Sequence, residues 1–432
     1  MFSVHDLTDS LRQGAAFLVT LLLIGIPAPA FAQSGATLKL DDLLLEALSR
    51  HPEIAAAAQA VESARSRIPQ AGALPDPMLS FQVQNIGESW TVGDEEMSMA
   101  GLSISQALPF PGKRALTRSI VNQETARAEA MLEEIKRRVV GELKQHYFDL
   151  ARIRQSRAIL HEIRRLLQTL IETAQARYSV GEGMQQDALQ ARAEWIRLTD
   201  RQFRLDQQEA DVKAAVNTTL LRPPDAPLGD PQPLRSPLPP QSASEFETVA
   251  LARSPRVIAS DTAIRMKEQM LKRTLRDRYP DMEIRLGYFD RGGFENLYEA
   301  MVSFNLPLYY RSKQSAAIRE AQADLTGARH GFAQTEQDVK RKVSQLHREM
   351  TTAHRWLELA EQGLLPQDRM AFESARAGYE VGKTDLQRLL NNLMTLLEDE
   401  IGLQETLFRY QKALAEMEVL TGLDLISQGG PS

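Results

Sequence analysis

The side chains that could bind a metal ion are few and scattered along the chain. Among the histidines, only His347 and His354 could share one helix face, and seven residues of helix separate them by about 10 Å. That distance is too long for two ligands of one ion unless a third group lies between them. Met97 and Met99 would point to the same side of an extended strand, but two thioethers without a third ligand make a weak soft-metal site. The sequence therefore predicts no metal site.

Groups for catalysis are equally sparse. The chain has no cysteine, which removes thiolate catalysis, disulfides, thiolate zinc sites and a lipidated N-terminal cysteine. We recognise no arrangement of serine, histidine and aspartate, no glycine loop for phosphate, and no pair of carboxylates with a pocket around it. We expect no catalytic residue and no cofactor, and the chain is not expected to be an enzyme.

Charge and hydropathy narrow the class of protein further. The net charge of −6 and the sequence pI near 5.8 argue against a general nucleic-acid binder, which needs a basic excess. The mean hydropathy of −0.32 excludes a polytopic helical membrane protein. It leaves open a β-barrel, whose spanning segments are short and only half apolar.

The N-terminus has the pattern of an export signal. An apolar run covers residues 14–31, and Ala30-Phe31-Ala32 supplies the small residues that a signal peptidase requires. The alternative is an uncleaved membrane anchor, but the run is short for a span of about 20 residues and contains Pro27 and Pro29. We expect residues 1–32 to be removed as a signal peptide and the mature protein to be exported.

The mature chain is a duplication. Three motifs recur in the same order, and the matched pairs are 47–54 with 250–257, 104–110 with 302–308, and 176–181 with 377–382. The chain is therefore divided into a first repeat (33–221), a second repeat (245–424) and a C-terminal segment (425–432) that is expected to be flexible. The connector at 222–244 carries eight prolines, a composition typical of an extended linker rather than a packed element.

Each repeat contains two short segments with a period of two. Strands are predicted at about 78–87 and 97–107 in the first repeat, and at about 282–289 and 298–306 in the second. One side of each strand is apolar and the other polar, which suits either an amphipathic soluble sheet or the wall of a membrane barrel with a wet lumen. Four strands cannot close a barrel, for which about eight are needed. Either the sheet is open and covered, or several copies contribute to one barrel, and a trimer would supply twelve strands.

The rest of the chain is predicted to be helical. A first helix covers about 40–69, with Asp41 as its N-cap. A very long helix follows from Lys113 to Tyr178, and apolar residues recur along it every three or four positions as in a coiled coil. Its counterpart runs from about 312 to 379, where 363–366 could interrupt it, and shorter helices cover about 185–220 and 385–420. Helices of this length suit a tube rather than a globular enzyme.

Together these features resemble the TolC family of outer-membrane efflux channels over essentially the whole mature chain. Two motifs that flank the first strand pair, at 74–78 and 104–114, are similar to the heavy-metal branch of that family, the CzcC/CusC-like outer-membrane factors. The resemblance implies a mainly α, TolC-like fold with a small β part. In that family three protomers each give four strands to one 12-stranded transmembrane β-barrel, and an α-helical coiled-coil tunnel continues it through the periplasm. An equatorial region surrounds the tunnel, and here it would include 222–244.

The resemblance also implies a role for the turns that end the long helices, at about 178–184 and 379–385. Both turns read Tyr-x-Val-Gly and fall at the periplasmic tips of the family, where a Val-Gly motif meets an adaptor protein. This assigns adaptor docking to Val180, Gly181, Val381, Gly382 and Lys383. The alternative is that the two glycines only end their helices, because the C′ position favours a positive φ.

A tyrosine of the second hairpin and an aspartate of the first hold the tips of the family closed. These positions are Tyr379 and Asp187 here, and we call the two residues the latch pair. A phenol that donates to a carboxylate contributes about 1 kcal/mol or more. The resemblance therefore implies a periplasmic gate at this pair.

A second link of the family departs from its pattern in this chain. The arginine position of that link is Thr384, beside Lys383, and its partner position is Gln186. The lumen-facing aspartates of some members fall at Arg388 and Asn391. The sequence therefore leaves open whether the second link is retained, and it gives no basis for an acidic ring at the entrance.

The polar sides of the strands would keep the barrel wet. The residues assigned to the barrel lumen are Gln82, Gln84, Ser103, Ser105, Glu283, Arg285, Ser303 and Asn305. The resemblance implies a passive homotrimer in outer-membrane lipid, with its tunnel in the periplasm, that exports heavy-metal cations together with a periplasmic adaptor and an inner-membrane RND pump. The alternatives are a multidrug channel and a periplasmic coiled-coil adaptor or scaffold. An adaptor normally carries one hairpin within a small β domain, which does not fit two tandem hairpins.

Overall fold

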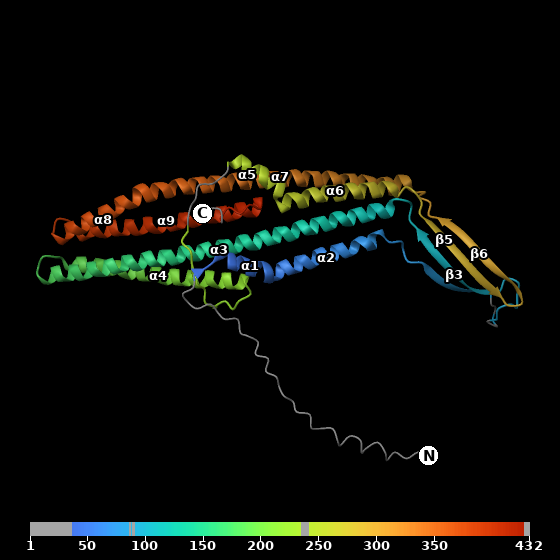
Figure 1. Ribbon diagram of the computed structural model, residues 1–432, viewed down its shortest axis with the longest axis horizontal. Helices are drawn as coiled ribbons and strands as arrows, with labels where there is room; N and C mark the ends of the chain where they lie inside the picture. The colour runs from blue at the N-terminus through green and yellow to red at the C-terminus, as the bar shows by residue number, and fades with distance from the viewer. Residues whose placement is uncertain (1–36, 86–87, 89–90, 235–241, 427–432) are drawn as a thin grey trace, which may run out of the picture.

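The computed structural model describes residues 37–85, 88, 91–234 and 242–426. The predicted signal peptide at 1–32 lies outside these residues, as do parts of the predicted connector and of the C-terminal segment. The described elements are, in chain order, β1 (Thr37–Leu38), α1 (Leu40–Arg50), α2 (Pro52–Gly72), β2 (Met78–Gln84), β3 (Met99–Leu108), α3 (Lys113–Ser179), α4 (Gln185–Thr219), β4 (Asp230–Pro231), α5 (Ala243–Arg253), α6 (Pro255–Arg276), β5 (Met282–Arg291), β6 (Phe294–Phe304), η1 (Tyr310–Gln314), α7 (Ser315–Leu359), η2 (Ala360–Leu364), α8 (Leu365–Glu380) and α9 (Leu386–Thr421). The molecule is long and narrow, with the four longer strands at one end and two helical tips at the other (Figure 1).

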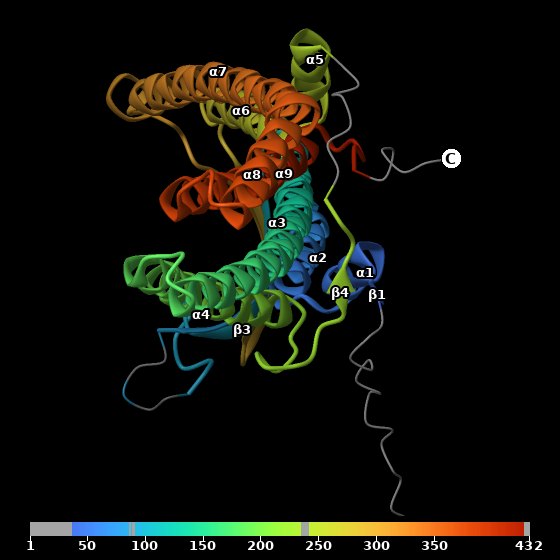
Figure 2. The same cartoon turned by 90° about the vertical axis from the view of Figure 1, so that its left-hand side faces the viewer.

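The helices run side by side along the long axis. α3 has 67 residues and is therefore about 100 Å long. It contacts α4 on the side of the tips and α2 and α6 on the side of the strands. Seen along the axis, the helices form a curved layer rather than a closed bundle (Figure 2). The helices of the described chain therefore leave one side of the layer uncovered by other helices.

The first predicted helix is in fact two helices, α1 and α2. Pro52 restricts the residue before it to extended backbone, and His51 has φ −63° and ψ 123°. The same break recurs in the second repeat between α5 and α6, where Pro255 follows Ser254. The predicted N-cap is also wrong: Lys39 occupies that position, and Asp41 lies in the first turn, where its charge suits the helix dipole.

The long helix of the second repeat is continuous but irregular. α7 and α8 are joined by η2, a short π-helical segment at 360–364 that precedes Pro366. Proline has no N–H to donate, and a π-helical turn accommodates the change in hydrogen bonding without ending the helix. The interruption that the sequence suggests at 363–366 is therefore a local bulge.

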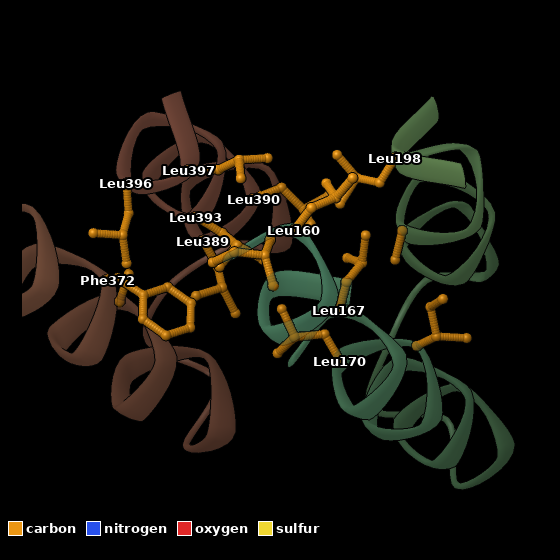
Figure 3. Packing of buried hydrophobic residues seen from close by; sticks show 14 of the residues in the cluster. Leu160, Leu167, Leu170, Leu198, Phe372, Leu389, Leu390, Leu393, Leu396 and Leu397 are labelled. Carbon is orange, nitrogen blue, oxygen red and sulfur yellow. The ribbon is translucent and has the colours of Figure 1, made fainter. Parts of the chain in front are cut away.

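The core is the seam between the long helices. α3 lies between α4 and α9, and leucines of all three helices interlock there (Figure 3). The apolar repeat predicted along α3 is confirmed by burial, because Val139, Leu143, Leu150, Ile153 and Leu160 are each at most 1% exposed. Truncating such a leucine to alanine costs about 2–5 kcal/mol of stability.

The described first part of the proline-rich connector, residues 222–234, packs against the helices, contrary to the prediction of an unpacked linker. Ala226 and Leu228 are buried, and β4 pairs with β1 in parallel. Polar side chains of the helices satisfy its carbonyl groups. The amide of Asn217 donates to the carbonyls of Pro224 (2.8 Å) and Ala226 (2.9 Å), and Arg154 donates to that of Gly229 (2.8 Å). Side-chain donors therefore hold a segment whose own backbone has few donors.

The four longer strands form one antiparallel sheet in the order β2-β3-β5-β6. β3 and β5 pair in the middle and join the two repeats, whereas β2 and β6 form the two edges. Among the described helices, none has an apolar stretch long enough to cross a bilayer.

Candidate functional site

The residues assigned to the barrel lumen all lie on one face of the sheet. Residues opposite each other in a ladder share a face. Gln82 lies opposite Gly101, Ser105 opposite Arg285, and Glu283 opposite Ser303, while Gln84, Ser103 and Asn305 have the same alternation. Side-chain contacts run along this face, from Gln82 to Gln84 (3.2 Å) and from Arg285 to Glu283 (3.4 Å). This face of the sheet therefore gathers the polar side chains, although the register also places Met99, Phe289 and Met301 on it.

The other face of the sheet is apolar and uncovered. One row across the four strands reads Leu79, Ile104, Leu286 and Ala300. In the next row Phe81 and Tyr298 are 71% and 82% exposed. An apolar surface of this extent marks a contact with lipid or with another protein.

The turns at the helical tips end on glycine in the left-handed region. Gly181 has φ +81° and Gly382 has φ +74°, and the N–H groups that follow close the turns onto the helices. The residues just before them, Val180 and Val381, are 70% and 67% exposed. Helix termination and an outward apolar contact are therefore compatible at both tips, and Lys383 is exposed beside the second.

The latch pair lies between the two hairpins of one protomer. Tyr379 is 4% exposed at the end of α8, and Asp187 lies in the first turn of α4. Burial raises the pKa of the Tyr379 phenol, the charge of Asp187 raises it further, and the charge of Arg177 opposes them. The phenol therefore stays protonated near neutral pH and remains a donor that faces a carboxylate.

Arg177 is a tip residue to which the sequence analysis gave no role. Its guanidinium donates to the backbone carbonyls of Tyr379 and Glu380, and it lies over the ring of Tyr379 at 5.2 Å from the centroid. It also donates to the carbonyl of Glu182 in its own turn (3.4 Å). The internal repeat is the one sequence signal that distinguishes Arg177 from other surface residues. The matching position of the second repeat is Gly378, whose missing side chain leaves space for Thr384.

The other tip positions have local roles. Thr384 packs against Gly378, and Gln186 is exposed on the first turn of α4. The backbone N–H of Arg388 donates to Asp385, the N-cap of α9 (2.7 Å), and Asn391 accepts from Gln387 (2.9 Å). Arg177, by contrast, joins the first tip to the second hairpin through the carbonyls of Tyr379 and Glu380.

Within the described residues there is no group of three or more histidine, cysteine, aspartate or glutamate side chains that could hold a metal ion. His347 lies beside Phe246 and His354 beside Tyr410, each with its ring partly buried. Met97 and Met99 have different environments, contrary to the prediction that both point to the same side of one strand. Met97 precedes β3 and is 57% exposed, whereas Met99 is buried at its start.

Known proteins resemble this chain in sequence and in fold. The family model for outer membrane efflux proteins matches residues 43–220 and 250–423. The cobalt-zinc-cadmium resistance protein CzcC of Cupriavidus metallidurans is 21% identical over 377 residues, which cover 86% of this chain and 87% of that protein.

Solved structures share the fold over most of their length. CusC has a TM-score of 0.76 at 15% identity, covering 88% of this chain and 91% of that chain. VceC of Vibrio cholerae also has a TM-score of 0.76, at 18% identity and with 88% and 96% covered. OprN has a TM-score of 0.75 at 18% identity, with 89% of each chain covered.

The family model covers most of both repeats, and the fold is that of the TolC-like channels. The predicted fold class is confirmed: the chain is mainly helical, with a small sheet at one end of long paired helices. The chain belongs to the outer membrane efflux protein family, whose members are non-enzymatic TolC-family channels of the outer membrane.

Proposed function

We propose that three copies of this chain form one passive conduit across the outer membrane. The observation that carries the proposal is the open sheet with an apolar face, a polar face and two unpaired edges. Three such sheets joined at their edges would close a ring of twelve strands. The apolar face would then contact lipid, and the polar face would line a wet pore.

The helical part would carry the pore through the periplasm. The exposed Val-Gly turns at 180–181 and 381–382, with Lys383, would dock to a periplasmic adaptor. The latch pair, Asp187 and Tyr379, would hold the tips closed until docking. Energy would come from an inner-membrane pump of the RND class, the partner that the resemblance to the CzcC/CusC-like branch implies.

The proposed cargo is a heavy-metal cation. The support is the similarity to the cobalt-zinc-cadmium resistance protein and the two motifs at 74–78 and 104–114. The fold does not favour one cargo, because structures such as CusC, OprN and CmeC all share it. With no metal-binding cluster among the described residues, the pump would select the cation and this chain would let it pass.

Growth of a strain that lacks the gene tests the proposal. Deletion should lower the tolerated concentration of zinc, cobalt, cadmium, copper or silver, and the intact gene should restore it. The membrane fraction of the complemented strain should hold a trimer that resists salt and alkaline extraction.

Unchanged metal tolerance with increased sensitivity to antibiotics or detergents would reassign the cargo to drugs. A polypeptide that alkali extracts as a monomer would contradict the channel itself.

A further inference from the structure

The two strand hairpins of the chain have the same register. In the second hairpin, Glu283 lies opposite Ser303. The motif Tyr279-Pro280-Asp281 before β5 corresponds to Leu74-Pro75-Asp76 before β2, which matches Glu283 to Met78. Leu-Pro at 306–307 corresponds to Leu-Pro at 108–109, which matches Ser303 to Ser105. In the first hairpin Met78 does lie opposite Ser105, so the two hairpins are structurally equivalent.

The central seam of the sheet, between β3 and β5, joins one hairpin to the other. Along this seam Ser105 lies opposite Arg285, and Ile104 opposite Leu286. At the end of the seam where β3 finishes and β5 begins, side chains just after β3 contact side chains just before β5. Lys113 binds the carboxylate of Asp281 (2.9 Å). We call this ion pair, together with the aromatic contact described next, the seam clasp.

The aromatic part of the seam clasp is a stacked pair of rings. Phe110 lies on Tyr279 with ring centroids 4.5 Å apart and planes inclined by 11°. The backbone N–H of Phe110 also donates to Asp281 (2.7 Å). Lys113 is almost buried, with 8% of its side chain exposed. The clasp therefore fixes both the register of the seam and the point where strands give way to helices.

The edge strands carry the matching parts of such a clasp, but nothing in the described chain completes it. Asp76 corresponds to Asp281 and Leu74 to Tyr279. Arg311 follows Leu306 by the same number of residues as Lys113 follows Leu108. Asp76 and Arg311 are exposed, and neither side chain has an ion pair within the described residues. Leu74 and Leu308 are 41% and 79% exposed.

We propose that a second copy of this chain completes the clasp, and that the seam between copies repeats the seam within one copy. β6 of one copy pairs with β2 of the next in the register of β3 with β5. Ser303 then lies opposite Ser80, and Val302 opposite Phe81. Asp76 pairs with Arg311 of the neighbouring copy, and beyond the strand ladder this ion pair is the main polar contact of the completed clasp, because the N–H of Leu308 already donates to Leu306 (3.0 Å).

The proposal rests on the proposed trimer and adds its register and its polar contact. The same rule applied at each edge closes the ring without a new kind of interface, since every copy offers one β2 edge and one β6 edge. It also explains why the two edge positions keep an aspartate and an arginine at the end of an apolar strand. Within one copy Ser80 and Ser303 lie on opposite edges of the sheet, and the three strand spacings alone separate them by about 14 Å. The residue of β6 directly across the sheet from Ser80 is Glu299, so Ser303 is farther away still.

Cysteine cross-linking tests the register of the seam between copies. The chain has no cysteine of its own, so only the introduced cysteines can form disulfides. A chain with Ser80→Cys and Ser303→Cys should form disulfide-linked dimers and trimers in outer membranes treated with copper phenanthroline. The matched control is Gln82→Cys with Ser303→Cys. Gln82 lies on the same face of β2 as Ser80, but it is two residues away from the position that the proposed register places opposite Ser303. Directly opposite positions are about 5 Å apart and diagonal ones about 7–8 Å, so the control should cross-link several-fold less.

Charge reversal tests the ion pair. Arg311→Glu should shift the dissociation of the trimer in SDS to a temperature several degrees lower, and adding Asp76→Lys in the same chain should restore it. The matched control is Lys313→Glu, which reverses an exposed charge two residues away and should have little effect. The proposal is overturned if the trimer forms but the shifted cysteine pair cross-links better, or if Lys313→Glu disrupts the trimer and Arg311→Glu does not. If membranes contain no trimer by blue native electrophoresis, the proposed channel fails as well.

Discussion

The guanidinium of Arg177 lies over the ring of Tyr379 at 5.2 Å from its centroid and donates to the carbonyl of the same residue. Arg177 ends the first hairpin and Tyr379 ends the second, so this contact joins the two helical tips of one protomer. The carboxylate of Asp187 is close enough to raise the pKa of the phenol, and the charge of Arg177 opposes this effect. Tyr379 therefore interacts with a cation and an anion that both belong to the first hairpin.

We predict that Tyr379→Phe makes the channel more conductive. The variant keeps the ring and its contact with Arg177 but removes the hydroxyl that faces Asp187. The latch requires the phenol to donate to Asp187 when the tips close, and losing that hydrogen bond would cost about 1 kcal/mol, or roughly a fivefold shift toward the open state per protomer. Single-channel conductance in planar bilayers measures the effect. The control is Tyr178→Phe, whose side chain is half exposed at the first tip and should leave the current unchanged. A closed-state current equal to that of the original protein would count against the latch.

Replacing Arg177 should have a larger effect than replacing Tyr379. Arg177→Gln removes a charged donor from the carbonyls of Tyr379 and Glu380 and also the cation over the ring. Hydrogen bonds to charged groups contribute about 1.5–3 kcal/mol, so the tips should separate more often than in Tyr379→Phe. The comparison of the two variants in the same bilayer assay is the test. Arg177→Lys should restore little, because an ammonium cannot serve several acceptors in one plane. A conductance below that of Tyr379→Phe would argue that Arg177 only stabilises its own turn.

The sequence predicts the duplicated architecture well because the signals are local and repeated. The seam along α3 follows from the spacing of residues such as Leu143 and Leu150, and both are fully buried. The strands follow from strict alternation, which places Gln82 and Phe81 on opposite faces. Such periodicities depend only on the geometry of one element.

Contacts between distant segments could not be predicted in the same way. Arg177 looks like an ordinary surface residue of a long helix, and only the fold brings it to the second tip. The connector looks unpacked because prolines dominate it, yet Asn217 at the end of α4 and Arg154, 75 residues away on α3, supply donors to it. The break before Pro52 does have a local signal, because a proline disfavours helical backbone at the residue before it. The prediction of one helix over 40–69 gives more weight to the helical periodicity than to this proline.

A buried ion pair near the middle of the tunnel provides a prediction about stability. The ammonium of Lys144 on α3 contacts Glu418 on α9 at 2.5 Å, and each side chain is 8% exposed. The other oxygen of Glu418 accepts from the backbone N–H groups of Leu425 (2.7 Å) and Ile426 (2.9 Å). Lys144→Met should therefore destabilise the protein by about 3–5 kcal/mol, because an uncompensated carboxylate would stay buried. Thermal unfolding followed by circular dichroism measures this loss.

The pH dependence of that variant follows from the direction of the shift. Burial raises the pKa of Glu418 although Lys144 and the backbone donors oppose it. A carboxyl whose pKa is raised in the folded state favours folding at low pH, and that contribution is lost as pH rises through the raised pKa. Without Lys144 the pKa should rise further, so the variant should lose more stability at pH 7.5 than at pH 5. The double variant Lys144→Met, Glu418→Gln should recover part of the loss at pH 7.5. A loss of equal size at both pH values would show that packing rather than charge is responsible.

A second carboxyl group should limit stability at neutral pH, because it faces another carboxyl. Partial burial raises the pKa of Asp368 on α8, and the nearby carboxyl of Asp399 on α9 raises it further. One oxygen of Asp368 is buried without a donor. Because the folded pKa is raised, the pair is tolerated at low pH, where Asp368 is protonated and can donate, and it becomes repulsive as pH rises. Asp368→Asn should therefore raise the free energy of unfolding at pH 7.5 by about 0.5 kcal/mol, as for other charge pairs near the surface, and should have no effect near pH 3.5. The melting temperature should rise accordingly at pH 7.5. Glu400→Gln is the control, since Glu400 binds Arg369 at 2.7 Å and its loss should not stabilise the protein. A melting temperature for Asp368→Asn that is unchanged or lower at pH 7.5 would mean that the two carboxyls do not repel each other in the folded channel.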